Sequence, residues 1–325
     1  MDKTTLIEEP ISQELVEFKN LIQSSFSSSN LLLNSVMEYL GQKKGKGMRP
    51  ILVILTARLF ADKITPATLH AACSLELLHN ASLVHDDVVD ESKERRGQLS
   101  VNAAFNNKVA VLAGDYLLAT SLVQVGFTRN LKIIDIVSRL GQDLSEGELL
   151  QLANVSNLVF SEDVYYDIIR KKTAVLFAAC TEAGALSVDA DDEMVGHARL
   201  FGEYLGLCFQ IRDDIFDYYD NADIGKPTGN DMLEGKLTLP VLHALNVAAN
   251  EEMNAIAIRV KTGQAQVDEI ARLVAFAKEN GGIEYAWKRM YEFKEKALGL
   301  IARYPDNDIR RALETYLDLV IERTK

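Results

Sequence analysis

Two short acidic segments hold the residues with the clearest chemical potential. They are HDDVVD (His85–Asp90) and RDDIFD (Arg212–Asp217), and they lie 127 residues apart, counted from Asp86 to Asp213. On a helix that turns by about 100° per residue, Asp86 and Asp90 are only ~40° apart, so each segment can present its carboxylates on one broad face. The apolar runs LELLHNASLV and YLGLCFQI precede the segments, which predicts that the carboxylates lie on largely buried helices.

Crowded carboxylates need compensation where water is scarce. Like charges one turn apart cost roughly a few tenths of a kcal/mol on an exposed helix, and several kcal/mol in a partly buried site unless protons or cations neutralise them. Oxygen ligands suit Mg²⁺ better than zinc, and Mg²⁺ prefers one or two carboxylates together with waters and substrate phosphates. The alternative is a pair of solvated charged stripes, the usual explanation of acidic runs. The repeated pattern favours Mg²⁺ and a diphosphate held between two acidic walls.

Several basic residues are placed where they could bind that diphosphate. Lys46 and Arg49 lie in GKGMRP, just before a predicted helix, and helix N-termini favour anions. Arg95 and Arg96 follow the first acidic segment directly. The remaining candidates lie in a helical stretch or after the second acidic segment: Lys171, Lys172, Thr173, Lys226 and Lys236. Arginine offers phosphate a bidentate fork and lysine a compact charge. Each residue taken alone is more typical of a solvated surface position, and it is their placement beside the carboxylates or at helix-start glycines that favours phosphate binding.

The composition narrows the classes of partner. The chain has 325 residues and a formal net charge of −12, so we expect no nucleic-acid partner, because such binding needs Lys and Arg against phosphates. The uncharged stretch Tyr116–Thr128 is shorter than the ~20 residues that span a bilayer, and MDKTTLIEEP has no apolar signal core. We therefore expect neither a transmembrane segment nor export. Three widely spaced cysteines, Cys73, Cys180 and Cys208, fit buried thiols in a reducing cytosol, which predicts a cytoplasmic protein.

Apolar periodicity predicts that helices position these residues. Only 6 prolines occur, few β-branched runs alternate, and breakers such as RRG at 95–97 and GG at 281–282 separate the periodic stretches. No linker or composition shift splits the chain, so we expect one all-α domain over residues 1–325. The predicted helices are Ile51–Phe60, Ala67–Val89, Val109–Gly126, Leu131–Gln151, Asp163–Leu186, Asp192–Tyr219, Thr238–Ala249, Val267–Asn280 and Glu284–Tyr304.

The ordered motifs resemble those of the trans-isoprenyl diphosphate synthases, or polyprenyl synthetases, and of their long-chain branch in particular. In chain order they are GKGMRP, ELLHNASLVHDDVVDESKERRG, GDYLL, GELLQL, KKTAVLF, FQIRDDIFD and GKPTGNDMLEGKLTLP. One DDxxD alone would be a weak signal, whereas two of them with RRG, KT and FQ in this order are specific. The resemblance runs from about Gly45 to about Leu319. It implies the isoprenoid synthase fold, a single large helical bundle around a central cavity, and a Mg²⁺-dependent trans-prenyltransferase.

The resemblance also implies roles for individual residues. Mg²⁺ would be held by Asp86, Asp90, Asp213 and Asp217. The allylic diphosphate would be held by Arg95, Lys172, Gln210, Lys226 and Lys236, and isopentenyl diphosphate by Lys46, Arg49, His79 and Arg96. The catalytic residues would be Lys172, Thr173 and Gln210, of which Thr173 and Gln210 would lie near the allylic cation. One departure from the family pattern is visible, because Gly47 stands where many members carry a basic residue.

The implied reaction is the head-to-tail condensation of an allylic diphosphate (dimethylallyl, geranyl or farnesyl diphosphate) with isopentenyl diphosphate, with release of diphosphate. Ala81 and Ser82, just before the first acidic segment, are small, whereas short-chain members of the family carry bulky aromatics there. We therefore expect a medium-to-long trans-polyprenyl product of roughly six to ten isoprene units (C30–C50), which needs an apolar tunnel of matching length. The resemblance further implies a homodimer.

Four other functions are open at this stage. A short-chain farnesyl or geranylgeranyl diphosphate synthase has the same motifs. A class I terpene cyclase usually carries Asn, Ser and Glu in its second metal motif, which RDDIFD lacks. A non-catalytic partner subunit of a synthase usually loses carboxylates, whereas this chain keeps all six. A histidine–aspartate phosphohydrolase around His85 would need further histidine ligands, and His70, His197 and His243 have no such context.

Overall fold

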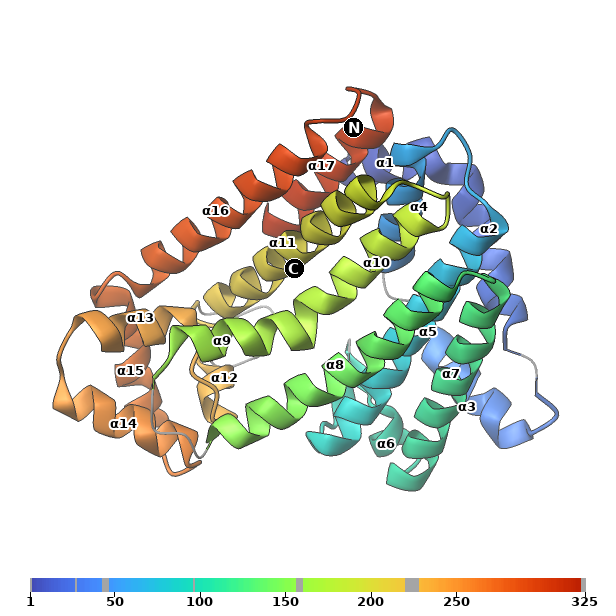
Figure 1. The fold of residues 1–325 in the computed structure, drawn as a ribbon. Coiled ribbons are helices and arrows are strands. Elements are labelled where there is room, and N and C mark those ends of the chain that lie inside the picture. The colour runs from blue at the N-terminus through green and yellow to red at the C-terminus, as the bar shows by residue number, and fades with distance from the viewer. Residues whose placement is uncertain are drawn as a thin grey trace. The chain divides into compact units, whose positions relative to one another are not determined.

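The computed structural model describes residues 2–26, 28–42, 47–95, 97–155, 160–219 and 228–322, which form helices joined by short loops (Figure 1). The chain divides into two compact units. Unit 1 combines Met1–Gly141, Phe177–Arg199 and Ala302–Tyr316, and unit 2 combines Gln142–Leu176, Leu200–Ile301 and Leu317–Lys325. The predicted all-α class is confirmed. The single domain over residues 1–325 stays a prediction.

In unit 1, the long helices α5 (Pro66–Val89) and α7 (Asn107–Phe127) pack along each other, and α4 (Met48–Phe60) packs against α5 (Figure 1). Almost every residue of α4 from Pro50 to Ala57 is buried, which fits its uniformly apolar sequence. The other elements of this unit are α1 (Lys3–Glu8), the 3-10 helix η1 (Glu9–Ile11), α2 (Ser12–Ser24), α3 (Leu31–Gln42), β1 (Glu94–Arg95), β2 (Gln98–Leu99) and α6 (Val101–Ala104).

The limits of α5 follow from local sequence signals. Thr65 caps its N-terminus in a capping box with Thr68, and Pro66 occupies the first turn, where its missing N–H costs nothing. The helix ends at Val89, and Asp90 is the C-cap residue. The first acidic segment therefore occupies the last turn of a mostly buried helix, as the sequence predicts.

A small hairpin after α5 is absent from the sequence prediction. Strands β1 and β2 pair antiparallel, with Glu94 opposite Leu99 and Arg95 opposite Gln98. Two-residue strands give no alternating pattern long enough to recognise. The hairpin fixes the backbone that carries Arg95.

Helix α7 is long and apolar enough to cross a bilayer by length and composition. The expectation of no transmembrane segment counted only the uncharged stretch Tyr116–Thr128, which is shorter than the helix. In unit 1 this helix packs along α5, with Ala110, Ala113 and Leu117 buried. It is a core helix of this unit.

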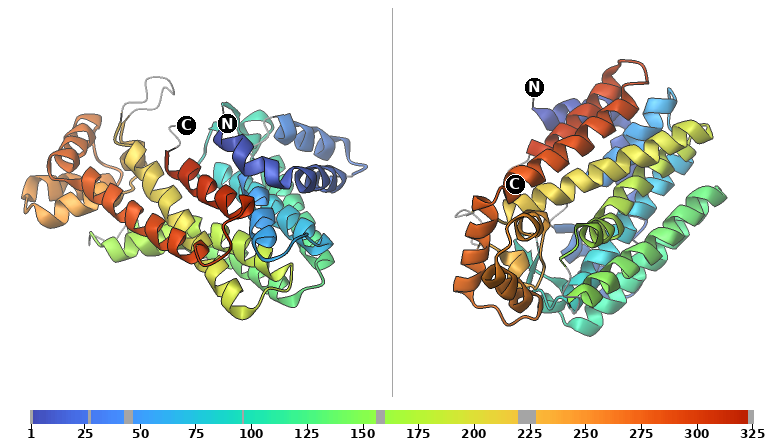
Figure 2. Two further views of the ribbon diagram at one scale, coloured as in Figure 1. Left: turned by 90° about the horizontal axis from the view of Figure 1, so that it is seen from above. Right: turned by 60° about the vertical axis from the view of Figure 1, so that its left-hand side comes forward.

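Unit 2 contains a group of shorter helices beside the long helix α16 (Gly282–Ile301). Helices α13 (Leu239–Val247) and α15 (Val267–Glu279) pack on each other and on α16, and α16 runs beside α11 (Asp192–Phe216) (Figures 1 and 2). The remaining elements of the chain are α8 (Leu131–Val155), α9 (Glu162–Ile169), the π-helix η2 (Arg170–Ala174), α10 (Val175–Leu186), α12 (Asn230–Leu233), α14 (Glu251–Lys261) and α17 (Asp308–Glu322). Of these, α8, α10 and α17 contribute residues to both units, as does α11.

The predicted helices and the predicted cysteine burial are largely confirmed. Each predicted helix has a counterpart, with ends that differ by a few residues, except that Asp163–Leu186 is interrupted by the π-helix η2. Cys73, Cys180 and Cys208 are free and buried, and burial raises the pKa of the Cys73 thiol to about 11 and of the other two to about 12. The sequence prediction misses the helices of residues 3–42 as well as α6, α12, α14 and α17.

Gly282 is predicted to be essential for the packing of α16. A Cβ atom at this position would lie 2.2 Å from the carbonyl oxygen of Pro240 and 2.8 Å from that of Ala277, and neither backbone atom can move cheaply. We expect Gly282→Ala to lower the free energy of unfolding by about 1–3 kcal/mol, as overpacking does. The matched control is Gly299→Ala on the same helix, where nothing lies within 4 Å, so it should be neutral or slightly stabilising. Urea denaturation measures both, and equal effects would contradict the prediction.

Candidate active site

The first acidic segment lies at the C-terminal end of α5. Asp86 is half-buried and Asp90, at the C-cap, is exposed. The last turn of α5 contains no basic residue, although the C-terminus of a helix carries partial negative charge and favours cations. The segment thus adds several carboxylates to an already negative helix end, an arrangement that a bound cation would stabilise.

Asp87 has a different role from its neighbours. Its side chain is only 3% exposed and accepts a 2.7 Å hydrogen bond from Nε of Arg95. Burial raises the pKa of the Asp87 carboxyl, and the Arg95 guanidinium opposes that increase. The ion pair anchors Arg95 through Nε and leaves its two terminal nitrogens as further donors. Arg95 is thus held beside the first acidic segment, as its predicted role in diphosphate binding requires.

The second acidic segment lies at the C-terminal end of α11, whose last turn also contains no basic residue. Asp213 is 44% exposed and forms an ion pair with Arg212. Asp217 follows the helix, and its carboxylate accepts the N–H groups of Asn230 at 3.0 Å and Asp231 at 3.1 Å. Asp217 therefore caps the N-terminus of α12 in addition to its predicted part in metal binding.

Asp231 is an acidic residue of this site that the sequence prediction missed. Burial, together with the charges of Asp217, Glu234 and Asp213, raises its pKa to about 6, against the opposing effect of Lys236. Asp231 lies in the segment GKPTGNDMLEGKLTLP, in which the sequence prediction gave a binding role only to the lysines. Asp231 adds another carboxylate to those at this end of unit 2.

The carboxylates fit a hard divalent cation by their chemistry. All the acidic groups are oxygen donors, and burial together with the charges of neighbouring carboxylates raises the pKa of Asp214 and of Asp231. Among the described residues, no three His, Cys, Asp or Glu side chains already converge as a complete metal cluster. An ion that keeps several waters and takes further oxygens from a substrate phosphate suits such a donor set.

Lys172 and Thr173 lie in the π-helix η2, and Gln210 lies on α11. Lys172 forms an ion pair with Glu148 at 2.5 Å and donates to Oε1 of Gln151 at 3.2 Å. Thr173 donates to Oε1 of Gln210 at 2.7 Å. Single-turn π-bulges often occur at functional sites, because the extra residue redirects neighbouring side chains. The structure thus brings the predicted pair Thr173 and Gln210 into contact.

Other predicted binding residues have the following positions. Arg49 is half-buried with its guanidinium carbon 5.6 Å from the centre of the Phe177 ring, and within the described residues its buried Nε has no hydrogen-bond partner. His79 is buried on α5. Lys236 pairs with Glu234, and Lys171 pairs with Glu146. Three predicted residues lie outside the described residues: Lys46, Arg96 and Lys226.

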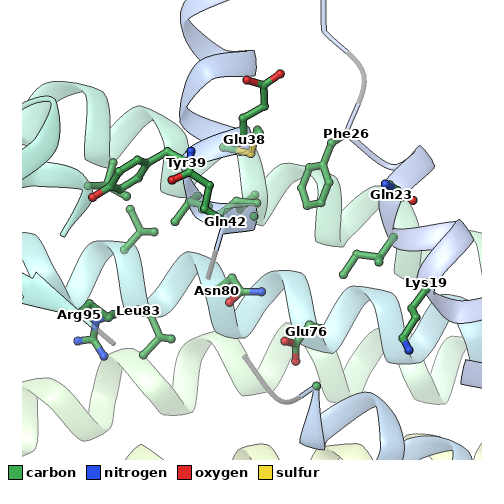
Figure 3. A pocket seen from close by; sticks show the side chains of 18 of the residues that line it. Lys19, Gln23, Phe26, Glu38, Tyr39, Gln42, Glu76, Asn80, Leu83 and Arg95 are labelled. Carbon is green, nitrogen blue, oxygen red and sulfur yellow. The ribbon is translucent and has the colours of Figure 1, made fainter. Parts of the chain in front are cut away.

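A cavity of about 1200 Å³ opens in unit 1 between α5 and the N-terminal helices. Figure 3 shows Glu76, Asn80 and Leu83 on one side of it and side chains of α2 and α3 around the others. Among the described residues, neither Ala81 nor Ser82 lines this cavity. It meets the first acidic segment at Asp87, so it lies on a different face of α5 from Asp86.

Comparisons with known proteins agree on one family. The profile "Polyprenyl synthetase" matches residues 30–277. The chain is 35% identical over 315 residues to the all-trans-nonaprenyl-diphosphate synthase (geranyl-diphosphate specific) of Rhodobacter capsulatus, which covers 97% of this chain and 96% of that relative. These matches include both acidic segments.

Solved structures give the same fold. The geranylgeranyl pyrophosphate synthase from Bacteroides thetaiotaomicron has a TM-score of 0.88 and 57% identity, covering 99% of this chain and 100% of that one. The polyprenyl synthase from Caulobacter crescentus CB15, complexed with calcium and isoprenyl diphosphate, has a TM-score of 0.90 and 31% identity, covering 99% and 98%. The expected isoprenoid synthase fold is therefore confirmed.

Proposed function

Because the chain belongs to the polyprenyl synthetase family and is a trans-prenyl diphosphate synthase, we propose that it condenses an allylic diphosphate with isopentenyl diphosphate into a C30–C50 product. The family uses divalent metal, and we assign Mg²⁺ to this chain. The supporting observation is that both acidic segments end long helices whose last turns contain no basic residue. Cations are favoured at both positions.

We assign the metal to Asp86 and Asp90 of α5 and to Asp213 and Asp217 of the second segment, with Asp231 as an added ligand. When bound, Mg²⁺ supplies Lewis-acid stabilisation of the departing diphosphate oxygens.

The side chains of this protein hold the substrates and exclude water. Arg95, Lys172 and Lys236 bind the allylic diphosphate, together with Lys226, so that positive charge faces the oxygens on which negative charge develops. Isopentenyl diphosphate is assigned to Lys46, Arg49, His79 and Arg96. Thr173 and Gln210 present oxygen atoms to the allylic cation, and apolar helix faces keep water away until the new carbon–carbon bond has formed.

The product length is the finer part of the proposal. Ala81 and Ser82 are small, and the R. capsulatus relative is named a nonaprenyl synthase, which supports a long chain. A second candidate is a C20 product, because the structure with 57% identity is a geranylgeranyl pyrophosphate synthase. Both candidates use the same residues for metal and diphosphate binding and differ only in the depth of the tunnel.

The proposal includes a cytoplasmic homodimer. Helix α7 leaves Leu112, Leu122, Val123 and Phe127 more than half exposed in the single chain. Large apolar side chains exposed together on a helix that is otherwise part of a core are typical of an interface. A second copy of this chain would cover them.

Product chromatography tests the proposed function. The purified protein is incubated with Mg²⁺, labelled isopentenyl diphosphate and, in separate reactions, dimethylallyl, geranyl or farnesyl diphosphate. We expect linear trans-prenyl diphosphates of C30–C50, and no product with EDTA. Accumulation of C20 alone would replace the long-chain proposal by the second candidate. Cyclic hydrocarbons, or no product with any primer, would contradict the synthase proposal.

A further inference from the structure

A hydrogen-bond network of four side chains in unit 2 connects a buried tyrosine to the residues assigned to the allylic cation. Tyr165 of α9 donates from its hydroxyl to Oδ2 of Asp214 at 2.6 Å. Gln210 donates from Nε2 to Oδ1 of the same carboxyl at 2.8 Å, and Thr173 donates to Oε1 of Gln210 at 2.7 Å. This hydrogen-bond network therefore links α9 and η2 to α11 through side chains alone.

Tyr165 and Asp214 are too deep to touch a substrate from solvent. They are 5% and 3% exposed, and neither is among the residues assigned to metal or diphosphate. A buried tyrosine hydroxyl needs a hydrogen-bond partner, and so does a buried carboxyl. Each therefore satisfies the other, which holds the Asp214 carboxyl in one orientation.

The orientation of Asp214 sets the orientation of Gln210 and Thr173. Burial raises the pKa of the Asp214 carboxyl, whereas the hydrogen bonds from Tyr165 and Gln210 favour its charged form. With these two donors the amide nitrogen of Gln210 faces Asp214, and the amide oxygen faces Thr173. Gln210 and Asp214 lie four residues apart on α11, where side chains share a face. The Thr173 hydroxyl then donates its only proton to Gln210, and its oxygen can present only lone pairs to any other group.

We propose that Tyr165 is a positioning residue for prenyl transfer, which fixes Gln210 and Thr173 through Asp214 so that Thr173 presents its oxygen rather than its proton to the developing allylic cation. This inference rests on the proposed role of Thr173 and Gln210. It assigns a function to a residue that no substrate contacts. Without the Tyr165 hydroxyl, Asp214 keeps only Gln210 as a side-chain donor, and its carboxyl is held less firmly in the orientation that fixes the Gln210 amide.

The test compares Tyr165→Phe with Tyr166→Phe. Both remove one hydroxyl from neighbouring positions of α9. The Tyr166 hydroxyl, however, accepts from Nε of Arg289 at 3.2 Å and has no part in the hydrogen-bond network of Tyr165. We expect Tyr165→Phe to lower kcat about tenfold, in the range of a misplaced catalytic group, with the KM for isopentenyl diphosphate unchanged. Tyr166→Phe should leave both constants near those of the wild type. The melting temperatures of both variants show how much stability each loses with its hydroxyl.

A double-mutant cycle with Thr173→Val separates positioning from general destabilisation. If Tyr165 acts through Thr173, Tyr165→Phe costs little further kcat once the threonine hydroxyl is gone, because effects within one network are not additive. Additive losses, or equal kcat for the two tyrosine variants, would overturn the proposal. If Tyr165→Phe fails to fold, Asp214→Asn interrupts the same hydrogen-bond network, because an amide offers one acceptor to two donors. This variant must then show the same lowered kcat with an unchanged KM. A wild-type protein that forms no prenyl diphosphate would refute the proposed function instead.

Discussion

Replacing Asp86 with asparagine is expected to lower kcat for prenyl transfer by about 10²–10³-fold, the range found when one preorganised electrostatic contact is removed from a transition state. Asparagine has the same shape but no charge, so it should weaken the metal site that we propose at the end of α5. The same change also removes a negative charge from a helix C-terminus, where such charges are unfavourable. Tm should therefore stay the same or rise while activity falls.

The control for this variant is Asp135→Asn. Asp135 lies on α8, its side chain is 57% exposed, and it pairs with Arg139 one turn away, so the same substitution there should change kcat little. Steady-state kinetics over a series of Mg²⁺ concentrations measure both variants. Asp86→Asn should require more Mg²⁺ for half-maximal activity. Wild-type kinetics in Asp86→Asn would mean that the first acidic segment is not a metal site.

The second large effect is on product length. Ala81→Tyr is expected to shorten the main product by several isoprene units, because a ring at this position would block the path of the growing chain. Each isoprene unit adds five carbons, and burial stabilises them by about 0.8 kcal/mol per methylene. A chain that can no longer be buried gains nothing from further extension, so release competes earlier.

Ala302→Tyr provides the comparison, because it adds the same ring at an exposed position just after α16. Reverse-phase chromatography of the products should show a shorter distribution for Ala81→Tyr and the wild-type distribution for Ala302→Tyr. Ala81 is 2% exposed, so the melting temperature is recorded to separate a changed tunnel from a changed fold. An unchanged product distribution in a folded Ala81→Tyr protein would remove this residue from the tunnel wall.

The sequence predicted the elements whose apolar pattern is long and continuous. Helices α5, α7 and α11 carry such patterns, and the acidic segments lie at or near the ends of α5 and α11, as expected. Helices α1 and α2 were missed because each buries only one or two side chains, such as Ile7, Leu15 and Phe18. Short helices of this kind depend on tertiary packing more than on their own sequence.

Parts of the site could not be predicted because they depend on side chains that meet only in the folded chain. The π-helix η2 adds one residue to a turn, which a 3.6-residue periodicity does not reveal. The contact between Tyr165 and Asp214 joins residues 49 positions apart. The second function of Asp217, as the cap of α12, likewise requires the path of the chain from α11 to Asn230.

The pairing of Arg212 has a practical consequence for handling this protein. Arg212 pairs with Asp213 and also donates to the carbonyl oxygen of Val320, near the end of α17. The final turn of α17 thus shares an arginine with an aspartate that we propose to bind the metal. An affinity tag is better fused to the N-terminus, and a shortened version made for crystallisation should retain the chain through Glu322.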